Sequence, residues 1–235
     1  MTEKTIQLRW AALPDFDGFL EALEERLPSQ ERRRAARLRV DAARHRFVLA
    51  RSMLRRHLGA TLGVDPQLLT FAAGDHGKPR LAFTEIEDPP RFNLSHSGNL
   101  VALITATAEV GIDIESLREI ANAERMARRF FSTGEQSRIT RLAGAARDRA
   151  FLRIWTQKEA YLKATGLGVG MPLHTVETEP DPAEPPGLRA IAGDRNEAAS
   201  WTLLEVEIPD AVCIVATREP AVELQVLRLM PVDLT

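Results

Sequence analysis

Cysteine is almost absent from this sequence, with Cys213 the single one in 235 residues. An internal disulfide and a cysteine metal cluster are therefore excluded, and the apolar run around Cys213 favours a buried strand residue. Aromatic residues make up 6% and charged residues 27%, which is an ordinary globular composition. The first residues contain no apolar signal core, and no run approaches the roughly 20 apolar residues that span a membrane. We expect a soluble, cytoplasmic protein.

The formal net charge is only -2, but the charge is unevenly distributed. Between Arg26 and His57 there are 11 arginines and two acids. This segment is either a solvated helical face with ion pairs or a site for a polyanion. The sequence pI of about 6.2 is low for a nucleic-acid-binding domain, so a compact phosphate ligand fits better.

Apolar periodicity predicts helices over 16–27, 30–58, 121–131 and 147–165, and strands over 6–10, 68–73, 92–95, 100–107, 110–115, 201–208, 212–217 and 223–229. The second helical stretch is expected to be interrupted once, and Ser132 to cap a helix that carries Glu135. Residues 74–79 form a turn signal. Strands 100–107 and 110–115 can be neighbours, and the last three strands are expected to form a meander. A weak echo between 101–107 and 212–217 gives slight support for two similar halves.

Two spacings place acidic side chains together. Asp113 and Glu115 are two apart in an apolar run, so on a strand both carboxylates leave the same face. Trp155, Glu159 and Lys163 recur every four residues and line one side of a helix. If these faces meet, three carboxylates can hold one Mg²⁺ with room for phosphate oxygens and water. The alternative for each acid is simple solvent exposure.

The neighbouring motifs are ambiguous when taken singly. Ser95 and His96 lack a Gly-x-Ser-x-Gly elbow, so His96 is either a phosphate hydrogen-bond donor or part of a strand terminus. Lys78 is either a turn lysine or a phosphate clamp. The glycine-rich stretch 166–170 is neither a Walker motif nor a dinucleotide fingerprint.

Taken in chain order, these motifs resemble the 4'-phosphopantetheinyl transferases, specifically the larger, Sfp-type group. The pattern W-x-x-K-E-A-x-x-K-x-x-G-x-G is filled at every fixed position from Trp155 to Gly168. The other matching stretches are Gly77-Lys78-Pro79, Phe92 to Ser97, Gly111 to Glu115 and Phe131 to Glu135. The resemblance implies a monomer with a mixed α+β fold. Its two similar halves, 1–108 and 109–235, would be related by a pseudo-twofold axis with the ligand site between them.

The resemblance also implies an activity. The enzyme would transfer the 4'-phosphopantetheine arm of coenzyme A to a serine of an apo acyl or peptidyl carrier protein, releasing 3',5'-ADP. Asp113, Glu115 and Glu159 would hold Mg²⁺, and Glu159 or a water that it orients would be the base. Lys163 would support the leaving phosphate, and Lys158 would pair with phosphate or stabilise the acids. Coenzyme A would be bound by Lys78, Ser95, His96, Arg32, Arg33, Arg34 and Arg51, with Arg44 and Arg46 behind them.

Carrier proteins are typically acidic, so the arginine-containing segment 117–131 is the expected docking surface. An ordinary amphipathic helix with solvated arginines is the alternative. Two other functions are compatible with the residues: a non-catalytic protein that binds coenzyme A or a nucleotide, and a Mg²⁺-dependent nuclease. We expect neither a nucleic acid nor a membrane as partner. The sequence does not specify the carrier, the breadth of specificity, or Mg²⁺ against Mn²⁺.

Overall fold

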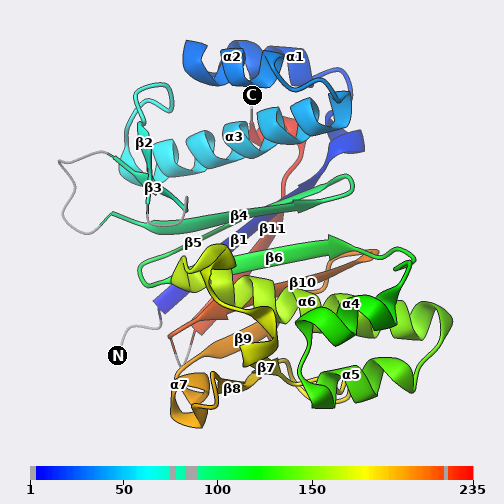
Figure 1. Cartoon of the computed structure of the whole chain (residues 1–235). Helices are drawn as coiled ribbons and strands as arrows, with labels where there is room; N and C mark the ends of the chain where they lie inside the picture. The colour runs from blue at the N-terminus through cyan, green and yellow to red at the C-terminus, as the bar shows by residue number, and fades with distance from the viewer. Residues whose placement is uncertain (1–3, 75–77, 83–88, 220–221, 235) are drawn as a thin grey trace.

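The chain folds into four layers, with two β-sheets packed face to face and helices on both outer sides (Figure 1). The computed structural model describes residues 4–74, 78–82, 89–219 and 222–234. The first sheet has the order β11 (Val222–Arg228), β1 (Lys4–Ala12), β5 (Leu100–Ala106), β4 (Arg91–Ser97). The second has the order β6 (Val110–Ser116), β10 (Ala211–Thr217), β9 (Thr202–Glu205). The apolar layer between the sheets includes Leu8, Ile104, Ile112 and Cys213.

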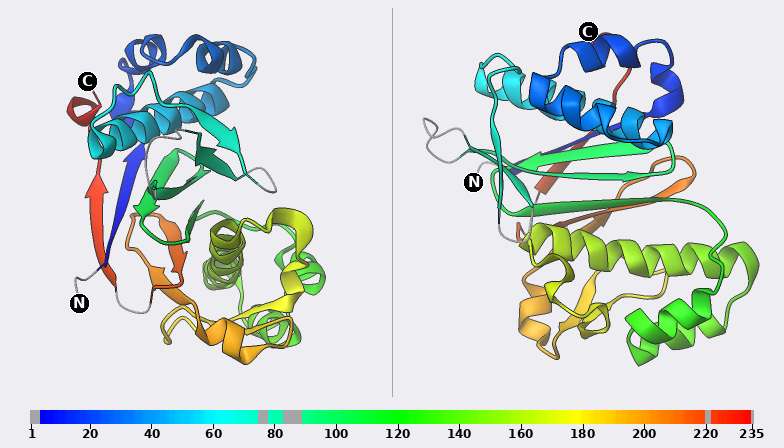
Figure 2. Two further views of the ribbon diagram at one scale, coloured as in Figure 1. Left: turned by 90° about the vertical axis from the view of Figure 1, so that its left-hand side faces the viewer. Right: turned by 45° about the horizontal axis from the view of Figure 1, so that its top comes forward.

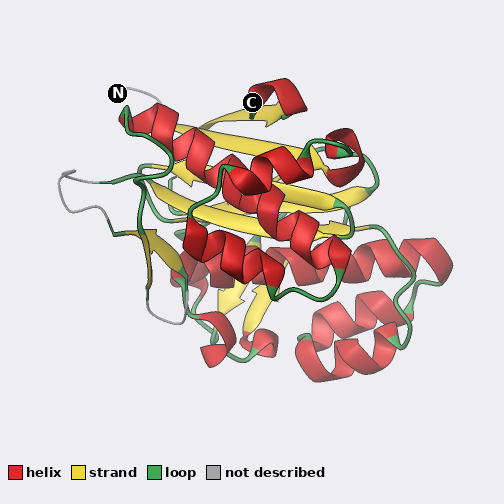
Figure 3. Ribbon diagram, turned by 90° about the horizontal axis from the view of Figure 1, so that it is seen from above, coloured by secondary structure: helices red, strands yellow, loops and turns green. Residues whose placement is uncertain are grey.

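The outer layers are helical. The first sheet is covered by α1 (Leu20–Glu25), α2 (Ser29–Ala36) and α3 (Asp41–Leu62), which lie in front of the strands in Figure 3. The second is covered by α6 (Gly144–Thr165), with α4 (Ala123–Phe130) and α5 (Thr133–Thr140) beyond it (Figure 2). Within the described ranges, none of the helices combines the length and apolar character that a membrane crossing requires.

Short elements complete the fold. Two-stranded hairpins are formed by β2 (Phe71–Ala73) with β3 (Pro79–Leu81), and by β7 (Val176–Thr178) with β8 (Leu188–Ile191). The remaining pieces are α7 (Arg195–Ala199) and the 3₁₀ turns Leu13–Phe16, Gly168–Gly170, Leu173–Thr175 and Pro231–Asp233. The predicted break in the second helical stretch is confirmed between α2 and α3, and Ser132 caps α5 in a capping box with Glu135. The predicted turn 74–79 lies partly outside the described residues.

Three strands of the first sheet repeat the topology of the second, which confirms the mixed α+β fold with two similar halves. In each sheet a central strand pairs antiparallel with two neighbours, in the orders β1-β5-β4 and β6-β10-β9. Each sheet is covered by a 22-residue helix, α3 or α6. The echo between 101–107 and 212–217 falls on β5 and β10, the corresponding central strands.

Two predictions of strand pairing are wrong. The C-terminal strands do not form a meander, because β11 leaves β10 and pairs parallel with β1. β5 and β6 are not hydrogen-bonded neighbours either, since they belong to different sheets. The division into 1–108 and 109–235 stays a prediction, with β11 lying in the sheet of the first half.

The edges of the two sheets are joined by side chains of β4 and β6 instead of a backbone ladder. Asn93 Oδ1 accepts a hydrogen bond from the backbone N–H of Ile112 (2.9 Å), and Ser95 Oγ accepts one from Ile114 (3.2 Å). Ser116 Oγ in turn donates to the carbonyl of Ser97 (2.9 Å). Buried backbone groups need such partners, and here the pairing brings the polar face of β4 against β6.

His57 is a buried histidine of α3 that makes folding sensitive to pH. Its Nε2 lies 2.8 Å from Thr105 Oγ1 and 3.4 Å from Arg9 Nη1. Burial, and then the charge of Arg9, lower the pKa of His57 from 6.5 to about 4. Because the folded pKa is the lower one, the stability that neutral His57 contributes is present above pH 6.5 and is lost as the pH falls towards 4.

A pKa difference of this size corresponds to about 3 kcal/mol. We therefore expect the wild type to lose about 3 kcal/mol more free energy of unfolding than His57→Gln when the pH is lowered from 7 to 4. Urea denaturation at both pH values measures this. Equal losses in the two proteins would contradict the assignment.

Candidate active site

Strand β6 and helix α6 are in direct backbone contact at Gly111. A Cβ atom on Gly111 would lie 2.2 Å from the carbonyl oxygen of Ala160 and 2.3 Å from the nitrogen of Ala164. Both alanines are fully buried and lie one helical turn apart. Small residues on both elements therefore let the helix lie directly on the strand, and the polar residues that flank the alanines come close to the carboxylates of β6.

Asp113 lies at the centre of this contact and is only 4% exposed. Its Oδ1 accepts hydrogen bonds from Ser95 Oγ (2.9 Å) and Lys163 Nζ (2.6 Å). Its Oδ2 is buried and has no hydrogen-bond partner within the described part of the chain. Burial raises the pKa of Asp113, against the opposing effect of Lys163. One carboxylate oxygen is thus left without a partner from the described part of the chain.

Glu115 is two residues from Asp113 on β6, and Glu159 of α6 is close enough to both for their charges to interact. Glu115 Oε2 accepts hydrogen bonds from Ser97 Oγ and Arg118 Nη1, both at 2.7 Å. Glu159 is half-buried, and burial followed by the negative charge of Asp113 raises its pKa, with a smaller effect from Glu115. This electrostatic coupling is typical of catalytic and metal-binding carboxylates.

The donor set suits a hard divalent cation. Magnesium prefers carboxylate oxygens together with water and phosphate, and the free Oδ2 of Asp113 is an oxygen of this kind. As the side chains stand in the described ranges, no three His, Cys, Asp or Glu residues are grouped closely enough to hold a metal ion. The ammonium of Lys163 is the positive charge now paired with Asp113. A metal held by Asp113, Glu115 and Glu159 would share the Asp113 carboxylate with Lys163.

The prediction that Lys158 acts beside these acids or on phosphate is wrong. Its side chain is completely buried and forms an ion pair with Glu135 (Nζ–Oε2 2.8 Å). It also donates hydrogen bonds to the carbonyl oxygens of Leu173 (3.0 Å) and Val176. One position along an α-helix turns the side chain by about 100°, so Lys158 points away from the face that carries Glu159.

Lys78 and His96 lie at the margins of the acid cluster. Lys78 Nζ donates to the carbonyl oxygens of Ala164 (2.9 Å) and Val110 (3.2 Å), which ties the end of α6 to the start of β6. It also lines a cavity of about 400 Å³. Partial burial and the charge of Arg46 lower the pKa of His96. Their predicted contacts with phosphate stay predictions.

A second cavity, of about 650 Å³, lies between α2, α3 and the β2–β3 hairpin. Two of its walls combine guanidinium groups with aromatic rings: Arg34 lies 5.2 Å from the centroid of Phe47, and Arg51 lies 4.4 Å from that of Phe71. Glu31 forms ion pairs with Arg51 and Arg55 and fixes both side chains. The predicted arginines that line this cavity are Arg33, Arg34 and Arg51, joined by Arg37 and Arg55.

The structure does not bring the other predicted arginines to this cavity. Arg32 is exposed and donates to the carbonyl oxygen of Glu25 (3.0 Å), because it faces the other side of α2. Arg44 pairs with Glu24 (2.8 Å), and Arg46 donates to the carbonyl oxygen of Gly98 (2.9 Å).

Three polar residues that support the site were not predicted from the sequence. Asn93 and Ser97 flank Ser95 at a spacing of two, and this alternation of polar residues along a buried strand was the available signal. Glu31 was recognisable as one of only two acids in the arginine-rich segment.

The structure thus combines two similar halves, acids facing a lysine, and a cavity lined by arginines. Comparison with known families gives the class. The model of the N-terminal part of 4'-phosphopantetheinyl transferases matches residues 9–108, and that of the 4'-phosphopantetheinyl transferase superfamily matches residues 109–216. The chain belongs to this superfamily, in its larger, Sfp-type group, and it is therefore a transferase.

Individual relatives agree with this assignment. The 4'-phosphopantetheinyl transferase HetI of Nostoc sp. is 39% identical, over 84% of this chain and 80% of that protein. A phosphopantetheinyl transferase of Thraustochytrium sp. is 30% identical, over 88% and 75% of the two chains. A 4'-phosphopantetheinyl transferase of Bacillus pumilus is 28% identical, over 90% and 83%. Family membership argues against the nuclease and non-catalytic alternatives.

Proposed function

We propose that this enzyme transfers the 4'-phosphopantetheine group of coenzyme A to a serine of an apo acyl or peptidyl carrier protein, with Mg²⁺. The serine oxygen forms a bond to the phosphorus of the phosphopantetheine arm. The phosphoanhydride bond breaks, 3',5'-ADP leaves, and the serine proton passes to a base. The observation that carries this proposal is the buried Asp113, whose Oδ1 pairs with Lys163 while its Oδ2 is free.

The acids and the lysine have different roles in the proposed reaction. Asp113, Glu115 and Glu159 would hold Mg²⁺, whose contribution is to neutralise charge on the pyrophosphate. Lys163 would donate to a phosphate oxygen as negative charge develops on the leaving group. Glu159, with its raised pKa, is the candidate base for the serine proton. The hydroxyl of Ser95 donates a hydrogen bond to Asp113 and accepts one from Lys163, so it holds these two side chains in position relative to each other.

The arginine-lined cavity would bind the 3'-phosphate and nucleotide end of coenzyme A. Guanidinium groups recognise phosphate through charge-assisted hydrogen bonds. Arg34 is exposed at this cavity and does not pair with Glu31, in contrast to Arg51 and Arg55, so its charge is more accessible than theirs.

Arg34→Ala is accordingly expected to raise KM for coenzyme A about tenfold, since a hydrogen bond to a charged group contributes roughly 1.5–3 kcal/mol. kcat should change little. Arg32→Ala is the matched control, because Arg32 belongs to the same helix and donates to the carbonyl oxygen of Glu25 outside the cavity. Steady-state kinetics at varied coenzyme A measures both variants. An equal rise in KM for the two variants would contradict the proposal that this cavity binds coenzyme A.

The carrier protein would dock on the surface of segment 117–131. Arg125 and Arg129 are exposed on α4, and Arg118 reaches back to Glu115 of the acid cluster. An acidic partner would be attracted to this surface and brought to the site. This surface also carries the exposed side chain of Leu117.

Intact-protein mass spectrometry tests the proposed function. An apo carrier protein is incubated with the enzyme, coenzyme A and Mg²⁺, and we expect the carrier to gain the mass of one phosphopantetheine arm. The gain should disappear with EDTA and return when Mg²⁺ is added in excess. Coenzyme A binding without any gain, across acyl and peptidyl carriers, would support the non-catalytic alternative instead.

A further inference from the structure

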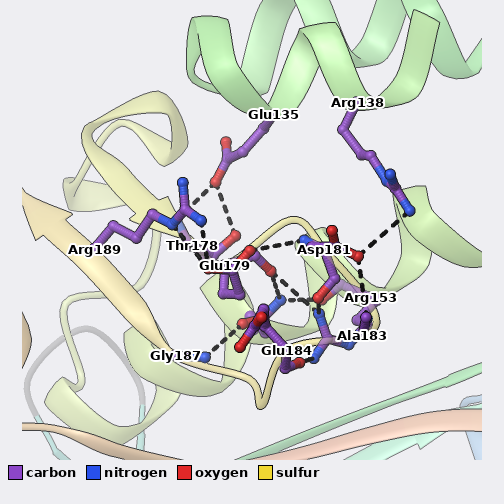
Figure 4. A network of polar contacts seen from close by, with 11 residues as sticks. Glu135, Arg138, Arg153, Thr178, Glu179, Asp181, Ala183, Glu184, Gly187 and Arg189 are labelled. Carbon is purple, nitrogen blue, oxygen red and sulfur yellow. Dashed lines mark hydrogen bonds and ion pairs between the residues drawn. The ribbon is translucent and has the colours of Figure 1, made fainter. Parts of the chain in front are cut away.

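Helix α6 is bound to the rest of the C-terminal half by three polar side chains on the side away from the acids. Arg153 donates three hydrogen bonds of 2.9–3.2 Å to backbone carbonyls of residues 179–184, as seen in Figure 4. Gln157 donates to the carbonyl of Glu179 and accepts from the backbone N–H of Gly187, both at 3.0 Å. Lys158 is the third, and its partners are the least accessible to water.

The carboxylate of Glu135 joins the start of α5 and strand β7 to Lys158 of α6. One oxygen accepts hydrogen bonds from the backbone N–H and the hydroxyl of Thr178, both at 2.8 Å (Figure 4). The other oxygen accepts from the backbone N–H of Ser132 (2.7 Å) and contacts Lys158 Nζ (2.8 Å). The start of α5, strand β7 and helix α6 therefore meet at one buried ion pair, whose side chains are 2% and 0% exposed.

This pair is costly as a means of stabilisation alone. Removing two charges from water carries a desolvation penalty that their attraction often does not exceed, and apolar residues of similar size frequently do as well. What the ion pair adds is a fixed orientation of the side chains that form it. An ammonium with a carboxylate and two carbonyl oxygens around it is held at defined distances and angles, whereas apolar packing is non-directional.

Directional contacts of this kind can fix the rotation of α6 about its own axis. The contact at Gly111 sets how closely α6 approaches β6. The alanines at that contact are small, so they do little to oppose rotation. Lys158 precedes Glu159 in the chain, and any rotation that displaces one displaces the other. Catalytic groups misplaced by about 1 Å can lose roughly a hundredfold in rate.

We propose that the Glu135–Lys158 ion pair is a positioning device that sets the rotation of α6, so that Glu159 and Lys163 face Asp113. Both members are positioning residues and touch no reacting atom. The inference rests on the proposed transfer reaction, because its effect is read in the turnover of that reaction.

A paired substitution separates positioning from stability. Lys158→Met alone leaves Glu135 buried without its counter-charge, so the free energy of unfolding should fall strongly. The double variant Glu135→Gln/Lys158→Met removes both charges, and the amide oxygen introduced at position 135 can still accept from Thr178. We expect the double variant to regain most of the stability. Its kcat should stay at least tenfold below wild type, with KM for coenzyme A changed less than about threefold.

The matched control removes an ion pair elsewhere in the chain. Asp15→Asn/Arg228→Met eliminates a partly exposed pair (2.7 Å) and should leave kcat and KM unchanged. A double variant with both stability and kcat like wild type would overturn the positioning role, as would a rise in KM that accounts for the whole loss. If the wild type itself transfers nothing to any carrier, the proposed function fails, which is a separate result.

Discussion

Gly111→Ala should destabilise the protein by about 3 kcal/mol or more and reduce turnover at least a hundredfold. The added Cβ would lie 2.2 Å from the carbonyl oxygen of Ala160 and 2.3 Å from the nitrogen of Ala164. These are backbone atoms of a 22-residue helix, so no side chain can rotate to relieve the overlap. The helix must move away from β6 and carry Glu159 and Lys163 with it. Urea denaturation and carrier-modification kinetics measure the two effects.

Gly134→Ala is the matched control for this substitution. Gly134 lies in the first turn of α5, and a Cβ atom there would meet nothing within 4 Å. Alanine is the better helix former by roughly 1 kcal/mol, so this variant should be as stable as wild type or more stable, with normal turnover. If Gly111→Ala behaved like Gly134→Ala, the close contact between β6 and α6 would not determine the geometry of the site.

Asp113→Asn should reduce turnover about a thousandfold or more while leaving the folded protein intact. The amide keeps the shape of the carboxylate but removes its charge and replaces one acceptor with a donor. The Oδ2 position is no longer free for a cation, and Lys163 loses its charged partner. Wild-type protein with coenzyme A should be stabilised against heat by Mg²⁺, and the variant should not be.

Stability is expected to respond in the opposite direction from activity. Burial raises the pKa of Asp113, so its charged form is disfavoured in the folded state and reduces stability as the pH rises above the unfolded pKa. At pH 7 the asparagine variant should therefore unfold at an equal or higher urea concentration. Asp148→Asn is the control, because Asp148 is also a buried aspartate with an arginine partner, Arg147. A variant at position 113 that retained more than a tenth of the wild-type turnover would refute the role of Asp113.

Sequence patterns predicted the acids because strand and helix periodicity fix which side chains share a face. Asp113 and Glu115 at a spacing of two, and Glu159 and Lys163 at a spacing of four, needed only the correct element type. The same patterns could not place Lys158, since its partner Glu135 is brought to it by tertiary packing. Arg32 and Arg34 are similarly indistinguishable in the sequence, and only the packing of α2 decides which one reaches the cavity.

The elements of the fold were also largely predictable, whereas the pairing of the strands was less so. Ser132 and Glu135 form a capping box that depends on a few adjacent residues, and it could be recognised directly. The strand Val222–Arg228 shows ordinary strand composition, which does not specify its neighbour. Its partner β1 lies at the other end of the described chain, and long-range pairing of this kind has no local signature.

The pairing of β1 with β11 has a consequence for how the protein is made. Lys4 pairs with Val222, so the first strand obtains one of its two neighbours only after about 220 further residues have been synthesised. At roughly 5–20 residues per second this delay is about 10–40 s. During that time one edge of β1 has no partner strand, and it can pair with strands of other chains that are being made on the same polysome. Completion of the first sheet thus waits for the synthesis of β11, long after β1 has been made.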